Sequence, residues 1–398
     1  MAEALTIRPG HPDFLELPWE MPLATWELPN LLDLPKGISR HEVRFLSYPG
    51  GIYVVKELST DPARNDYTVL RELESVDAPA VTAVGLVENR TDDPTEEASA
   101  ALITAYEPFS FSYREILAGA GFGPRRNQML DAFAGLLVEL HLADCFWADC
   151  SLSNVLYRFD AEAIVTIMVD AETAVIFPGG LSDGRRLEDL EIMIENVAGG
   201  MADIAAEAGV DLEQADLDLG YDIAERYTKL WAELRKSETI TSEERFRITE
   251  RIERLNRLGF DVDEVDLLPS VDDTAELVIK VKVGGRNFHA NRLKSLTGVE
   301  ALENQAKAIL SDVHYYSARA GGDTMSGKAA WAVRWRVGEF EPLLAKLRTV
   351  PGVVDPVQAY TDLLHHRYMM AAALGRDVVN DEALQDWIAN GRPGYPLS

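Results

Sequence analysis

The chain has 398 residues, of which 47% are hydrophobic and 26% are charged, and its formal net charge at pH 7 is −28. This length allows two or three domains with cores of their own, and the hydrophobic content is that of an ordinary globular protein. The strongly negative charge argues against general nucleic-acid binding and against docking on anionic lipid.

The cysteines and the N-terminus bear on the compartment. The two cysteines, Cys145 and Cys150, predict no structural disulfide and favour a reduced, cytoplasmic location. The first 21 residues have neither a basic region nor an apolar core, which predicts no signal peptide. Because no run of about 18 apolar residues occurs, we expect no membrane span.

The first part of the chain predicts a small sheet with one helix. Residues 1–34 are rich in Pro, Leu and Trp, and we expect an irregular extension that packs Trp19 and Trp26 on the first lobe. Strands are predicted at 42–47 and 52–58, with a turn at 48–51 between them. Further strands are expected at 81–87 and 100–104.

A lysine and an aspartate stand out in this part. Lys56 lies near the end of a predicted strand, where a lysine is commonly a solvated edge residue. The helix predicted over 62–76 places Asp66 on one face with Leu70 and Leu73. Glu72, on the same predicted helix, points off that face.

The central stretch carries the chemistry. Apolar residues at helical spacing over 129–140 predict a buried helix, and Asp149 and Asn154 follow it in a D-x4-N pattern. Strands at 155–157 and 164–169 predict a hairpin that brings Asn154 close to Asp170. Phosphoryl transfer needs a carboxylate to hold the acceptor hydroxyl, and an Asn and a second carboxylate to hold Mg²⁺. The alternative is that Asp149 and Asp170 are ordinary turn residues.

The remaining chain predicts more helices and a second domain. Helices are expected at 186–207, 217–235 and 243–258. Asp189, on the first of these helices, either ties that helix to the loop at Asp149 or lies on the solvated face of the helix. Alternation over 276–283 predicts a strand that turns at Gly284-Gly285 and returns through 286–292. Helices are then expected near 300–311, 339–347, 356–374 and 381–390. The G-x4-G-K spacing at 322–328 lacks the Ser or Thr of a P-loop, which favours a flexible loop.

Two segments carry a resemblance to a known family. WADCSLSN at 147–154, followed by VDAE at 169–172, resembles the catalytic and metal-binding loops of the lipopolysaccharide-kinase family, the Kdo and heptose kinases, and of the RIO-type atypical kinases. The resemblance covers roughly the first 230 residues. It also extends to a narrower bacterial family that adds a C-terminal domain of unknown function.

The resemblance implies an α+β architecture, a two-lobed protein-kinase-like fold followed by a small α+β C-terminal domain. The expected division is an N-terminal extension at 1–34, a kinase-like N-lobe at 35–106, a C-lobe at 107–236, and a helical linker with the C-terminal domain at 237–398. The implied cofactors are ATP and Mg²⁺.

The resemblance also implies roles for particular residues. Asp149 and Lys56 would be catalytic, Asn154 and Asp170 would bind the metal, and Lys56 would pair with the α- and β-phosphates. Asp66, which stands where resembling kinases carry a Glu, would steady Lys56, and Glu72 is the rival partner. The other cofactor-binding candidates are Gly37, Ser39 and Arg40 near the phosphates and Glu107 at the hinge beside adenine.

Two departures from the family pattern leave two functions open. Trp147 stands where kinases usually carry a His, and Ala171-Glu172 replaces Phe-Gly. The first expectation is an ATP- and Mg²⁺-dependent phosphotransferase acting on a hydroxyl of an unidentified sugar or protein. The alternative is a nucleotide-binding pseudokinase, a regulatory or scaffolding module whose C-terminal domain recruits a protein partner.

Overall fold

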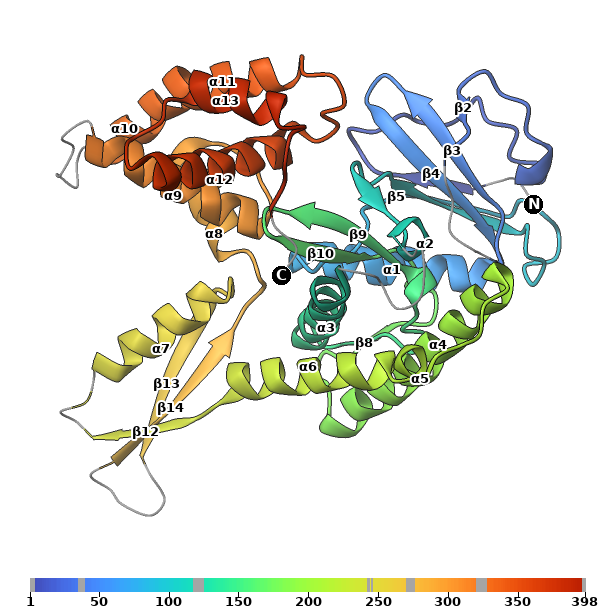
Figure 1. The fold of residues 1–398 in the computed structure, drawn as a ribbon. Coiled ribbons are helices and arrows are strands. Elements are labelled where there is room, and N and C mark those ends of the chain that lie inside the picture. The colour runs from blue at the N-terminus through green and yellow to red at the C-terminus, as the bar shows by residue number, and fades with distance from the viewer. Residues whose placement is uncertain are drawn as a thin grey trace. The chain divides into compact units, whose positions relative to one another are not determined.

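A computed structural model describes residues 4–34, 40–116, 125–241, 244, 246–269, 276–319 and 328–395. The chain forms two compact units (Figure 1). The first contains residues 1–158 and 165–231, and the second contains residues 159–164 and 232–398. Both units mix helices with strands, which confirms the predicted α+β class. The four-part division expected from the sequence stays a prediction.

The first unit begins with a six-stranded antiparallel sheet in the order β1-β5-β6-β4-β3-β2. Helix α1 packs on β5 and β6, and one core joins Trp19 and Trp26 of the N-terminal segment to Val55 and Ile103 of the sheet. The aromatic N-terminal segment is therefore part of the core, as expected. The bounds are β1 Ala4–Ile7, β2 Leu31–Leu32, β3 Val43–Tyr48, β4 Gly51–Leu58, α1 Thr60–Ser75, β5 Ala83–Glu88 and β6 Ala100–Ala105.

The rest of the first unit is mainly helical. Its centre is the helix α3, in which Leu130, Phe133, Leu136, Leu137 and Leu140 are buried. Short strands and a hairpin cross next to α3, and two long helices follow. The bounds are β7 Ser110–Phe111, α2 Tyr113–Ile116, α3 Arg126–Leu142, β8 Cys145–Phe146, η3 Leu152–Asn154, β9 Val155–Asp160, β10 Ala163–Met168, β11 Val175–Ile176, α4 Asp183–Ala208, α5 Gln214–Leu217 and α6 Leu219–Arg235.

The second unit contains a three-stranded sheet, in the order β12-β14-β13, and a group of helices. It also includes the tip of the β9–β10 hairpin, residues 159–164. The bounds are β12 Glu238–Thr241, α7 Phe246–Arg257, β13 Val262–Pro269, β14 Glu276–Val283, α8 Phe288–Thr297, α9 Glu303–Arg319, α10 Lys328–Trp335, the π-helix η5 Arg336–Phe340, α11 Glu341–Leu347, α12 Pro356–Leu374 and α13 Asn380–Ala389.

One prediction for this unit is wrong. Residues 286–292 do not return as a strand after Gly284-Gly285; β14 pairs instead with β13, which precedes it, and with β12. Helix α8 begins at Phe288 because its side chains at helical spacing, Leu293 above all, pack into the helical core of this unit. The segment 320–327, which holds most of the G-x4-G-K spacing, lies outside the described residues.

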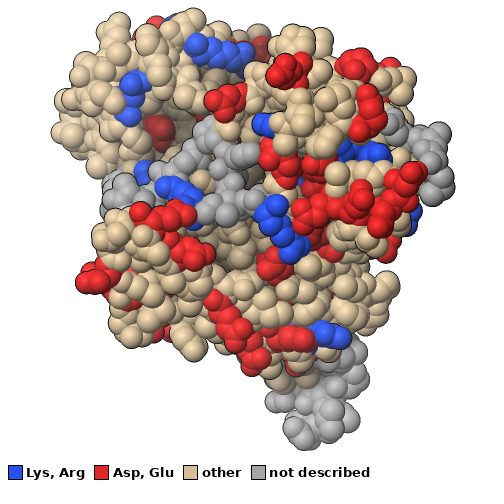
Figure 2. Space-filling view, turned by 90° about the vertical axis from the view of Figure 1, so that its right-hand side faces the viewer, with Lys and Arg blue, Asp and Glu red and all other residues tan. Residues whose placement is uncertain are grey.

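Charge and hydropathy follow the composition. The face drawn in Figure 2 carries Asp and Glu more densely than Lys and Arg, in keeping with the net charge of −28. In the described part of the chain, every helix is too short or too polar to cross a membrane.

Candidate functional site

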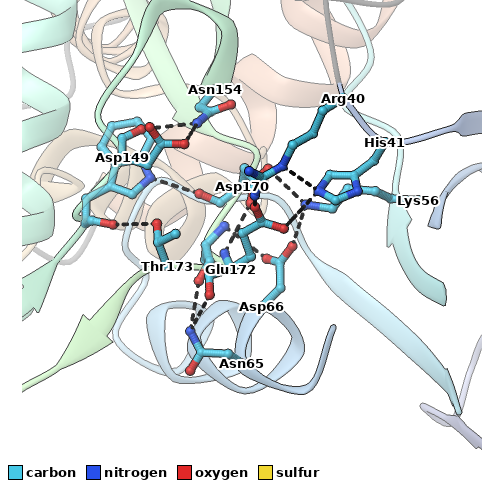
Figure 3. Close-up of polar contacts among 12 residues, drawn as sticks. Arg40, His41, Lys56, Asn65, Asp66, Asp149, Asn154, Asp170, Glu172 and Thr173 are labelled. Atoms are coloured by element: carbon cyan, nitrogen blue, oxygen red, sulfur yellow. Dashed lines mark hydrogen bonds and ion pairs between the residues drawn. The ribbon is translucent and has the colours of Figure 1, made fainter. Parts of the chain in front are cut away.

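The ammonium group of Lys56 lies at the centre of the candidate site, between carboxylates from two other segments (Figure 3). Its Nζ is 2.9 Å from Oδ2 of Asp66 and 2.9 Å from Oδ2 of Asp170, and 3.8 Å from Oε2 of Glu172. Burial acts to lower the pKa of Lys56, but the charges of Asp66 and Asp170 outweigh it and raise that pKa. Lys56 is therefore cationic, and it links the strand β4 to the end of the hairpin.

Asp66 holds Lys56 from helix α1 and is inaccessible to solvent. Its Oδ1 accepts a hydrogen bond of 3.0 Å from the backbone N–H of Ala171. Burial raises the pKa of Asp66, and the ammonium group of Lys56 opposes that rise. Glu72, the rival partner, is exposed. The Asp66 side chain, although one methylene shorter than a Glu, therefore reaches Lys56 directly.

Asp149 and Asn154 lie on one loop, and a helix from farther along the chain meets them there. The amide of Asn154 donates to Oδ2 of Asp149 at 2.9 Å, and the amide of Asn196, on α4, donates to Oδ1 at 3.1 Å. Burial raises the pKa of Asp149; the hydrogen bond from Asn154 opposes this, and the nearby Asp170 carboxylate adds to it. Two amide donors thus fix the orientation of a half-buried carboxylate.

The loop rests on a buried carboxylate, Asp189 of α4. Its oxygens accept the backbone N–H groups of Trp147 at 2.7 Å and of Ala148 at 2.8 Å. His141 contacts Asp189 through Nε2 at 3.1 Å, and its Nδ1 lies 2.7 Å from the hydroxyl of Tyr227. Asp189 is fully buried, so of the two expectations for this residue the tie to the loop is confirmed.

Trp147, which stands where kinases usually carry a His, contacts both the end of the hairpin and helix α3. Its indole N–H donates to the backbone oxygen of Asp170 at 2.9 Å, and its ring lies buried near Phe133 of α3. Ala148, next along the chain, has a φ of 65°, in the left-handed region that is costly for a residue with a Cβ. Asp189 and Trp147 therefore hold a backbone turn that the local sequence alone disfavours.

The segment after Asp170 is held from α1. The amide of Asn65 donates to the backbone oxygens of Glu172 and Ala174, both at 2.9 Å, and to that of Ala171 at 3.3 Å. The backbone N–H of Glu172 donates to Oδ1 of Asp170 at 3.1 Å. The turn at 171–174 is thus stabilised by one side chain from helix α1.

Glu172 itself meets the segment that leads into the sheet. Its carboxylate pairs with Arg40 and lies 3.1 Å from Nε2 of His41. Burial lowers the pKa of His41, and the nearby charges of Lys56 and Arg40 lower it further. Arg40 therefore lies beside the candidate site, whereas Gly37 and Ser39, the other residues expected near the phosphates, lie outside the described residues.

A cavity of about 620 Å³ lies between the sheet and the helical part of the first unit, and its lining includes Arg40, His41, Glu172 and Asn196. Its apolar surface comes from the sheet and from the ends of the hairpin, and its polar surface includes Lys56, Asp149, Asn154 and Asp170. Glu107 is also in the lining, and burial raises the pKa of its carboxyl group. Pockets of this size are typical of sites for small ligands and cofactors. The apolar lining residues include Val43, Phe45, Val54, Val81, Leu102, Phe111, Leu152, Val155, Leu156 and Val169.

Asn154 and Asp170, the residues expected to bind Mg²⁺, supply part of the set of ligands that this ion needs. The backbone N–H of Val169 donates to the carbonyl of Asn154 at 3.1 Å, so Asn154 lies beside the strand end that leads to Asp170. A carboxylate and an amide oxygen are ligands that Mg²⁺ accepts together with phosphate oxygens and water. No group of three His, Cys, Asp or Glu side chains in the described ranges could hold a metal ion without such added ligands.

Several residues of the site were not expected from the sequence. His41, Asn65 and Asn196 come from segments remote from the D-x4-N pattern, and His141 lies at the end of α3, eight residues before Asp149. Only Asn196 had a sequence signal that could have found it, because it lies seven residues after Asp189 on the same helix face. The other three depend on tertiary contacts that no local pattern reveals.

Comparison with known proteins shows one family model that matches the C-terminal region. Residues 229–391 match the family model described as a domain of unknown function (DUF4032). This match confirms the expected C-terminal domain of unknown function. The chain is similar to a solved structure of WaaP in complex with acyl carrier protein over 57% of this chain and 86% of that chain, with 16% identity and a TM-score of 0.33. No curated protein matches. The lipopolysaccharide-kinase resemblance stays a prediction.

Proposed function

We propose that the first unit is a phosphotransferase of the kinase type, which uses ATP and Mg²⁺ to phosphorylate a hydroxyl group of a sugar or a protein. The observation that carries the proposal is the position of Lys56, at 2.9 Å from both Asp66 and Asp170. The three residues come from a strand, a helix and the end of a hairpin, and Lys56 and Asp170 line a cavity together with Asp149 and Asn154.

In this proposal each side chain has one task. Lys56 binds the nucleotide phosphates, and Asp66 keeps the ammonium group in place. Asp149 orients the acceptor hydroxyl and takes its proton, a role that suits a carboxylate whose pKa is raised by burial. Asn154 and Asp170 hold Mg²⁺, which supplies positive charge between the phosphates.

Positioning of charge accounts for most of the catalysis in this chemistry. Asp149 has two fixed amide donors, from Asn154 and Asn196, so its oxygens are oriented before any substrate binds. The loop that carries it is held by Asp189 and Trp147. The proposal therefore does not depend on the His that kinases usually carry at the position of Trp147.

The test is ATP consumption in a single turnover with and without Mg²⁺. We expect Asp149→Asn to lower the rate by about 100-fold or more, since general-base groups contribute about 10²- to 10⁴-fold. Asp170→Asn should remove the Mg²⁺ dependence of nucleotide binding. Glu191→Gln, a change of an exposed carboxylate on α4 outside the cavity lining, is the matched control and should react like the parent.

The alternative function is a nucleotide-binding pseudokinase. An observation that favours it is that Lys56, Asp170 and Arg40 are already paired within the protein, so bound phosphates must compete with carboxylates for both cations. A chain of this kind binds ATP and is stabilised by it, but transfers no phosphate. Phosphate transfer that is lost in Asp149→Asn would exclude the pseudokinase.

A further inference from the structure

The β9–β10 hairpin joins the candidate site to the second unit. Asn154 directly precedes β9, and Asp170 follows β10 by two residues, so both expected metal-binding residues lie at the root of this hairpin. The tip, residues 159–164, belongs to the second unit, so its contacts with α9 and α12 are contacts within that unit.

The tip carries a buried carboxylate that caps a helix. Asp160 is inaccessible to solvent, and its Oδ1 accepts the backbone N–H of Gln305 at 2.7 Å. Its Oδ2 accepts the backbone N–H and the side-chain amide of Asn304, both at 2.9 Å. Asn304 and Gln305 lie in the first turn of α9, where backbone N–H groups have no partner inside the helix. A residue 144 positions earlier in the sequence supplies that cap.

The turn itself is held by one glutamine. Gln358, in the first turn of α12, accepts the backbone N–H of Ala161 at 2.8 Å and donates to its carbonyl at 3.1 Å. Ala161 has a φ of 53°, in the left-handed region, although it carries a Cβ. An exposed hairpin turn needs neither a buried carboxylate nor such a clamp, because water satisfies its backbone groups.

We propose that Asp160 and Gln358 are positioning residues, which fix the hairpin from its tip and thereby set the placement of Asn154 and Asp170 at its root. This inference rests on the proposed function for its catalytic consequence. A strand of six residues is stiff over about 20 Å. The backbone N–H of Val169 donates to the carbonyl of Asn154 at 3.1 Å, and this hydrogen bond joins the two ends of the hairpin. Exchange of the Val169 amide hydrogen therefore measures how often the root opens.

The test compares the full-length parent with Gln358→Ala and Asn304→Ala, which alter the clamp and leave every residue of the candidate site unchanged. Tyr360→Phe is the matched control, because it removes a buried hydrogen bond to Asp312 in the same unit and does not touch the hairpin. Two quantities are measured: the hydrogen exchange rate of the Val169 amide, and the Mg²⁺ concentration that half-saturates binding of a non-hydrolysable ATP analogue.

We expect both clamp variants to raise the Val169 exchange rate and the half-saturating Mg²⁺ concentration about threefold or more, below the 10- to 100-fold typical of groups that contact a metal ligand directly. Tyr360→Phe should change neither quantity. An unchanged Val169 rate in the clamp variants, or an equal change in Tyr360→Phe, overturns the inference.

The two proposals fail in different ways. If the parent binds the analogue with no dependence on Mg²⁺, the proposed function is wrong, and faster Val169 exchange in the clamp variants still supports the positioning role. If Mg²⁺ dependence is present but equal in the parent and the clamp variants, the catalytic consequence is wrong and Asp160 and Gln358 serve the fold alone.

Discussion

Lys56 and Asp66 form a buried ion pair. Neighbouring charges outweigh burial in setting the pKa of Lys56, whereas burial outweighs them at Asp66. The nearby carboxylates of Asp66 and Asp170 keep Lys56 charged. Asp66 is fully buried, and the loss of hydration raises its pKa to about 6 in spite of Lys56. The folded protein therefore holds a proton on Asp66 at pH values where the unfolded chain has released it.

The pH dependence of Asp66→Asn tests this account. Between the unfolded pKa of 3.8 and the folded pKa of about 6, the folded state binds more protons than the unfolded state, so the stability contributed by Asp66 falls as the pH rises. We expect the stability of the parent relative to Asp66→Asn to decrease by about 2–3 kcal/mol from pH 4 to pH 7. Urea unfolding at several pH values measures it.

Two features make the result interpretable. Burial also raises the pKa of Asp160 to about 6, and the difference between parent and variant removes that contribution. Asp61→Asn, at the start of the same helix, changes a side chain that is 94% exposed and should leave the profile of the parent unaltered. A parent advantage that grows with pH would mean that Lys56 outweighs burial at Asp66.

Asp189 is the second residue on which the site depends. It accepts two backbone N–H groups and contacts His141, whose pKa burial lowers, so a neutral imidazole donates to the carboxylate through Nε2. Asp189→Asn replaces one carboxylate oxygen, which accepts a hydrogen bond, by an amide NH₂ group, which then faces an N–H donor. We expect a loss of about 2–3 kcal/mol in unfolding free energy, measured by urea denaturation.

This change should also lower the proposed activity, because the loop at Asp149 loses its support. Glu188→Gln, an exposed neighbour on α4, is the control and should match the parent in both measurements. A stable but inactive Asp189→Asn would show that Asp189 positions the loop without contributing to the fold.

At the scale of elements, the sequence predicted those with strong periodicity and missed those set by distant contacts. The helices expected at 186–207 and 217–235 correspond to α4 and α6, since their apolar residues recur at helical spacing. The hairpin at 276–292 was wrong because alternation identifies a strand but not its partner. In the site, the D-x4-N spacing led to Asp149 and Asn154, whereas His41 and Asn65 reach the site only through tertiary contacts with Glu172.

The crossing of α4 and α6 depends on a glycine. A Cβ built on Gly220 would lie 2.7 Å from the Cα of Ile194, a backbone atom that cannot move away alone. We expect Gly220→Ala to destabilise the protein by about 1–3 kcal/mol through overpacking, although alanine favours helices. Gly199→Ala is the control: a Cβ there meets nothing within 4 Å, so it should stabilise α4 by up to about 1 kcal/mol. A stable Gly220→Ala would show that the helices can separate.

At the scale of the whole molecule, the units are not consecutive in the sequence. Residues 159–164 lie inside the predicted C-lobe but count with the second unit. This partition could not be predicted, because the hairpin tip reads as an ordinary turn. Its partners, Asn304 and Gln358, lie 144 and 197 residues away from Asp160 and Ala161.

A truncation after Lys236, at the boundary expected from the sequence, should therefore damage the part that remains. Asp160 and Ala161 would lose the donors and the clamp that now bury them, and Ala161 would keep a left-handed φ with nothing to hold it. We expect the fragment 1–236 to melt at a lower temperature than the first unit does in the full-length chain, as measured by calorimetry. Ala161→Gly should recover part of the loss in the fragment, because glycine adopts this conformation freely. The same change should also stabilise the full-length chain slightly, because the relief of the left-handed strain exceeds the entropy that glycine gains when unfolded. A fragment that melts like the full-length chain, with no effect of Ala161→Gly, would show that the first unit is complete without residues 237–398.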